Sequence, residues 1–82
     1  MHVKKRPTKT LREIERLLAQ AVRKTPGCED FVSLVVHVVE AGPDGFNWSA
    51  GFANYGRANH MVCNEALARA VQELGLQFDA VG

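Results

Sequence analysis

The sequence contains no long hydrophobic run. Nowhere do about 18 apolar residues follow one another, which excludes a helix that spans a membrane. A secretory signal is not expected either, because Arg12, Glu13, Glu15 and Arg16 interrupt the first apolar segment, residues 11–22. Without an export signal the expected location is the cytoplasm, and no membrane partner is expected.

The motifs that carry most known chemistry are also missing. The sequence has no Gly-rich phosphate loop, no paired-carboxylate signature and no nucleophile elbow. Cys28, Cys63, His37 and His60 would make a Cys2His2 set, but their spacing lacks the close ligand pairs of zinc sites. Free thiols are expected for both cysteines in a reducing cytoplasm. No catalytic residue, metal or cofactor is therefore predicted, and the chain is not expected to be an enzyme.

The composition is that of a small soluble globular domain. The chain has 82 residues, of which 46% are hydrophobic and 23% are charged. This length corresponds to one domain. Residues 1–7 are polar and basic and are predicted to form a flexible arm, which leaves residues 8–82 as a single α+β domain.

The most apolar stretch, FVSLVVHVV at residues 31–39, predicts a β-strand buried on at least one face. Alternation places Val32, Leu34, Val36 and Val38 on one face, which is purely aliphatic and is expected to point inward. The other face is mixed and carries Ser33, Val35, His37 and Val39.

A second strand is predicted from Trp48 to Tyr55, after a turn whose Gly-Pro-Asp-Gly sequence suits a hairpin. Trp48, Ala50 and Phe52 are expected on the inner face, whereas Ala53 and Tyr55 are expected on the outer face. Gly51 weakens the strand and is interpreted as a bulge or a close contact.

Helices are predicted on both sides of this hairpin. The first has an apolar stripe at helical spacing and a Thr10–Glu13 capping pair, although Thr8 is an equally good cap. The second starts near Asn59 and ends at or beyond Gly75. The predicted fold is therefore α-β-β-α, an antiparallel β-hairpin with two helices packed on one face.

A hairpin with helices on only one face leaves its other face exposed, which favours binding of a partner. Two-stranded sheets are marginal on their own, and both strands are edges, so pairing the hairpins of two chains is the expected remedy. The outer face is the predicted partner-binding surface, for a second copy or for another protein. Its residues are Val35, His37, Val39, Ala53 and Tyr55. The leading hypothesis is a non-enzymatic interaction or regulatory module that acts as a homodimer.

Charge asymmetry supports an alternative hypothesis, a nucleic-acid-binding accessory protein. Residues 1–24 hold eight basic and two acidic residues, a net charge of +6, whereas residues 25–82 have a net charge of −5. A basic segment of this kind can bind phosphates. The candidate contacts are Lys4, Lys5, Arg6, Lys9, Arg12 and Arg16.

A candidate anion site lies before the second helix. Helix N-termini offer free N–H groups and a favourable dipole to anions. Gly56 permits close approach there, Asn59 is the expected cap, and Arg57 and His60 can add positive charge.

Overall fold

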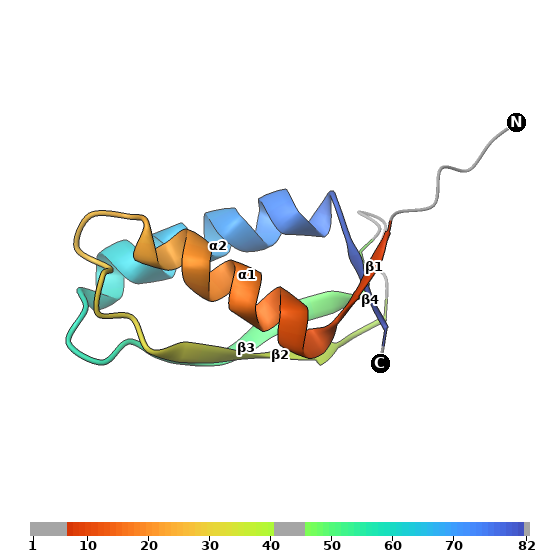
Figure 1. The fold of residues 1–82 in the computed structure, drawn as a ribbon, viewed down its shortest axis with the longest axis horizontal. Coiled ribbons are helices and arrows are strands. Elements are labelled where there is room, and N and C mark those ends of the chain that lie inside the picture. Colours follow the sequence, from red (N-terminus) through yellow and green to blue (C-terminus); the bar gives the residue numbers. More distant parts are fainter. Residues whose placement is uncertain (1–6, 41–45, 82) are drawn as a thin grey trace, which may run out of the picture.

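The computed structural model describes residues 7–40 and 46–81. Its elements, in chain order, are β1 (Thr8–Thr10), α1 (Leu11–Arg23), β2 (Ser33–Val38), β3 (Trp48–Asn54), α2 (His60–Gly75) and β4 (Asp79–Val81). The predicted mixed α+β fold with two helices and an antiparallel hairpin is confirmed. Figure 1 shows both helices on the same side of the β2–β3 hairpin, with α1 packed on β2. None of the helices in these described residues is long and apolar enough to span a bilayer.

A second, two-stranded sheet was not predicted. β1 and β4 pair in parallel, with Thr8 opposite Asp79, and this pair is separate from the hairpin. Asn47 anchors β4, because its side-chain oxygen accepts the N–H of Ala80 at 2.7 Å and its amide nitrogen donates to the carbonyl of Ala80 at 3.1 Å. The predicted order α-β-β-α therefore lacks one strand at each end. The hairpin itself keeps only two strands among the described residues.

Both helices begin where side-chain caps were predicted. The Thr10 hydroxyl accepts the backbone N–H of Glu13 at 3.2 Å, which decides between the two candidate caps of α1. The Asn59 side chain accepts the N–H of Val62 at 3.1 Å and caps α2. Each cap satisfies one of the backbone donors that the first helical turn leaves unpaired.

The core lies between the helices and the hairpin. Trp48 is its largest fully buried side chain, and the indole N–H donates to the carbonyl of Phe78 at 2.9 Å. α2 ends at the buried Gly75, where a Cβ atom would lie 2.6 Å from the ring of Phe46. The other buried apolar residues are Ile14, Leu18, Ala19, Val22, Cys28, Phe31, Leu34, Val36, Ala58, Cys63, Leu67, Ala70 and Ala80.

Candidate functional site

The outer face of the hairpin carries exposed apolar side chains. Val35 is 51% exposed and Phe52 is 77% exposed, and His37, two residues after Val35 on the same strand, is also exposed. Neither helix covers these residues, because both pack against the opposite face (Figure 1). We call Val35, His37 and Phe52, together with the neighbouring edge of β3, the hairpin surface.

Five predicted positions in the hairpin are wrong. Val32 and Val38, which were expected inside with Leu34 and Val36, are 47% and 49% exposed. Ala53 and Tyr55 are partly buried and pack against the core, so they do not belong to the outer face. Phe52, which was expected inside, points to solvent. Val39 is half-buried. Of the predicted partner-binding residues, the structure therefore leaves Val35 and His37 fully on the exposed face.

A β-bulge explains the reversals at Phe52, Ala53 and Tyr55. Leu34 pairs with Ala53, but Val36 pairs with Ala50, so Gly51 and Phe52 together lie opposite one residue of β2. One extra residue exchanges the two faces of the strand beyond it. Gly51 allows a close approach at this point, because a Cβ atom there would lie 3.0 Å from the exposed His37 ring. The interpretation of Gly51 as a bulge and close-contact residue is confirmed.

Side chains of α1 make hydrogen bonds to the backbone of β2 and of the two residues before it. The Glu15 carboxylate accepts the backbone N–H of Val36 at 2.8 Å. The Arg23 guanidinium donates to the carbonyl of Phe31 at 2.8 Å and also to that of Val32. Such cover hinders the addition of another strand at this edge.

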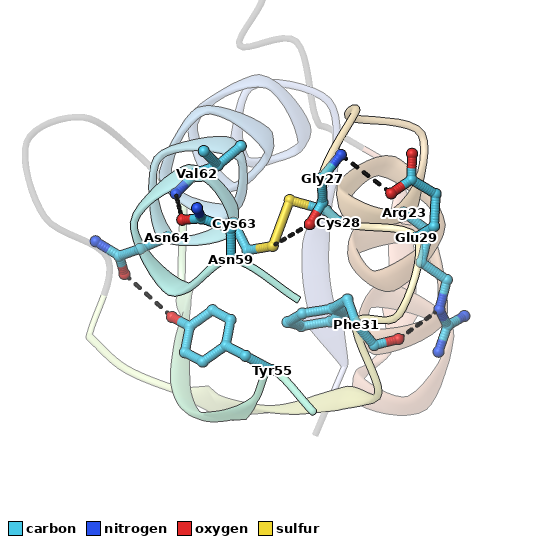
Figure 2. Close-up of a disulfide and its surroundings, with 10 residues drawn as sticks. All are labelled: Arg23, Gly27, Cys28, Glu29, Phe31, Tyr55, Asn59, Val62, Cys63 and Asn64. Atoms are coloured by element: carbon cyan, nitrogen blue, oxygen red, sulfur yellow. Dashed lines mark hydrogen bonds between the residues drawn. A yellow bond between two sulfur atoms is a disulfide. The ribbon is translucent and has the colours of Figure 1, made fainter. Parts of the chain in front are cut away.

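The opposite side of the hairpin is more open. Among the described residues, no side chain makes a hydrogen bond to the backbone of β3. A groove of about 330 Å³ separates β3 from α2, because the facing residues Ala50, Gly51, Ala53 and Ala68 are small. The hydroxyl of Tyr55 bonds to the side-chain oxygen of Asn64 at 3.2 Å across this groove (Figure 2). β3 is therefore the edge at which another strand can add.

Cys28 and Cys63 form a disulfide, so the prediction of free thiols is wrong. The bond joins the loop after α1 to the first turns of α2, and the two Cα atoms lie 5.6 Å apart (Figure 2). Both residues are fully buried. The free-thiol prediction depended on a cytoplasmic location, whereas disulfides persist mainly in oxidising compartments. The cytoplasmic location itself stays a prediction.

The residues of the candidate anion site have structural contacts of their own. The side chain of Asn59 uses its oxygen to cap α2, and the His60 ring lies 4.7 Å from the ring of Tyr55. Gly56 has a positive φ of 58° and lies so close to Asp30 that a Cβ atom would be 2.9 Å from its carbonyl. Arg57 is exposed. Anion binding here stays a prediction, although packing and capping explain three of the four residues.

The predicted basic contacts fall into three groups. Lys4, Lys5 and Arg6 lie outside the described residues. Lys9 has partners, because its ammonium lies 3.8 Å from the Glu13 carboxylate and 4.7 Å from the centre of the Phe78 ring. Arg12 and Arg16 are exposed on α1.

Comparison of the chain with protein-family models, with curated proteins and with solved structures gives no match in any of the three.

Proposed function

We propose that this protein is a small non-enzymatic interaction module that acts as a homodimer, and that the hairpin surface joins the two copies. The observation that carries the proposal is Phe52, an aromatic side chain that is 77% exposed on a sheet face without cover. Burial of such a side chain contributes about 1.5–3 kcal/mol. Val35, 51% exposed on β2 opposite the bulge, extends the apolar area.

The strand edges support a specific arrangement. The β2 edge is hindered by Glu15 and Arg23, so the second copy is expected to add at β3. A twofold axis would then place β3 antiparallel to its own copy and make one four-stranded sheet. Such a sheet is large enough for independent stability, which a two-stranded sheet lacks. Phe52 from each copy would lie near the axis and form a cross-strand aromatic pair.

The disulfide gives this hairpin a fixed base. Cys28 lies five residues before β2, and Cys63 lies near the start of α2. The bond therefore lies near the open end of the hairpin, where Phe31 precedes β2 and Tyr55 follows β3. The rings of Phe31 and Tyr55 meet edge to face at 5.7 Å. A rigid strand loses less conformational entropy when it pairs with a second strand. The fixed base therefore favours association.

Light scattering coupled to size-exclusion chromatography tests the proposal with two matched variants. Phe52→Asp places a charge on the hairpin surface, whereas Met61→Asp places the same charge on α2, where Met61 is 82% exposed. Wild type and Met61→Asp should elute as dimers, and Phe52→Asp should elute as a folded monomer. A monomeric wild type, or a dimer that survives Phe52→Asp, would show that the proposal is wrong.

A further inference from the structure

Three arginines of α1 lie along one side of an open groove. Arg12, Arg16 and Arg23 are four and seven residues apart, so they share one face of the helix. They line a groove of about 260 Å³, whose other side is the start of β2 with Val32, Ser33 and Leu34. Arg12 and Arg16 also line an adjoining hollow of about 190 Å³, together with Thr10 and Glu13. Arg12 and Arg16 therefore lie between the two hollows and line both of them.

Two acidic side chains share this surface, because Glu15 lines the groove and Glu13 lines the adjoining hollow. The Glu15 carboxylate accepts the backbone N–H of Val36, and the Glu13 carboxylate contacts Lys9 and the Thr10 hydroxyl. Three arginines against one glutamate leave the lining of the groove with a formal net charge of +2.

Arg12 and Arg16 differ from these carboxylates because their guanidinium groups have no such partners in the described part of the chain. Arg23 is held by the carbonyls of Phe31 and Val32, but Arg12 and Arg16 make no hydrogen bond or ion pair with the described residues. Both are exposed. The groove thus offers two uncommitted guanidinium groups about one helical turn apart.

We propose that this groove binds the phosphate backbone of a nucleic acid, with Arg12 and Arg16 each contacting a phosphate. Guanidinium groups bind phosphate in bidentate geometry, and they keep their charge at every physiological pH. The net charge of +6 over residues 1–24 complements a polyanion.

The lining of the groove also indicates that the site would not recognise the bases of the nucleic acid. No aromatic residue lines either hollow, so base stacking is not available there. Phosphate contacts fix position but carry no sequence information. The expected binding is therefore independent of sequence. It does not depend on the hairpin surface, because the arginines lie along the opposite edge of the hairpin from β3.

Fluorescence anisotropy with a labelled DNA duplex of arbitrary sequence tests the proposal on the full chain over a range of salt concentrations. Each phosphate contact contributes about 0.9 to the slope of log K against log salt. The R12Q/R16Q variant should therefore bind more weakly, with a slope smaller by about 1.8. Since neither side chain has a partner among the described residues, its melting curve should match that of wild type.

Two further variants separate a specific contact from general charge. K24Q/R69Q removes the same charge from exposed positions outside both hollows and should keep the wild-type slope. R12K/R16K retains the charge in the groove and should also show the wild-type slope. The proposal would be overturned by a wild type that does not bind, by equal slopes in wild type and R12Q/R16Q, or by equal losses in R12Q/R16Q and K24Q/R69Q.

Discussion

Loss of the Cys28–Cys63 disulfide should remove a large share of the stability of this domain. The two cysteines are 35 residues apart, and the cross-link therefore closes a loop of that size in the unfolded chain. Loop-closure entropy for such a loop corresponds to about 4 kcal/mol at 25 °C. A domain of this size has a free energy of unfolding of roughly 4–12 kcal/mol. Reduction is thus expected to remove between about a third and all of the free energy of unfolding.

Thermal unfolding followed by circular dichroism, with and without a reductant, measures this effect on one protein. A loss of about 4 kcal/mol should lower the midpoint by roughly 15–30 °C. Trp48 provides a second probe, because its buried indole becomes exposed to water when the core opens. The C28A/C63A variant should melt like the reduced wild type, and its midpoint should not respond to the reductant.

Two results would refute this reasoning. Thiol titration of the oxidised, denatured protein should find no free thiol, so two reactive thiols per chain would mean that the bond does not form. Equal midpoints with and without reductant would mean that the cross-link contributes no stability. The first result would also restore the basis for the reducing location that the sequence suggested.

Two other substitutions test how the ends of the hairpin are held. Gly75→Ala should destabilise the domain by about 1–3 kcal/mol through overpacking against the Phe46 ring, which exceeds the helix propensity that alanine adds. Chemical denaturation should show the loss, and Phe46→Leu in the same chain should recover part of it. Asn47→Ala should cost about 1–3 kcal/mol, because both backbone groups of Ala80 lose their partner. Unchanged hydrogen exchange at the Ala80 amide in that variant would contradict the role given to Asn47.

Local sequence patterns were sufficient for the helices. The stripe of Ile14, Leu18 and Val22 repeats at helical spacing, and the caps Thr10 and Asn59 act on backbone groups three residues away. All of these interactions lie within one element or at its boundary. They do not depend on contacts with distant segments of the chain, so the sequence alone predicts them.

The faces of the hairpin could not be predicted in the same way. Strict alternation assigns Phe52 to the core and Tyr55 to solvent, and the observed bulge reverses both. Gly51 marks the position of the irregularity, but the register depends on the partner strand, and specifically on Val36 pairing with Ala50. The outer face could therefore be predicted only up to the bulge.

Contacts between distant segments were missed altogether. β1 and β4 have three residues each, and Thr8 meets Asp79 only after the whole chain has folded. The separation between Cys28 and Cys63 likewise says nothing about the distance between them in space. Free thiols were predicted from the expectation of a reducing compartment alone.

Hydrogen exchange at low and high protein concentration tests the central claim most directly, because it reports both self-association and its location. If two copies pair through β3, then the amides of β3 should gain protection as the concentration rises, whereas the exposed amides of α2 should not change. Exchange rates along β3 that are the same at every concentration would contradict the dimer and the role given to the hairpin surface.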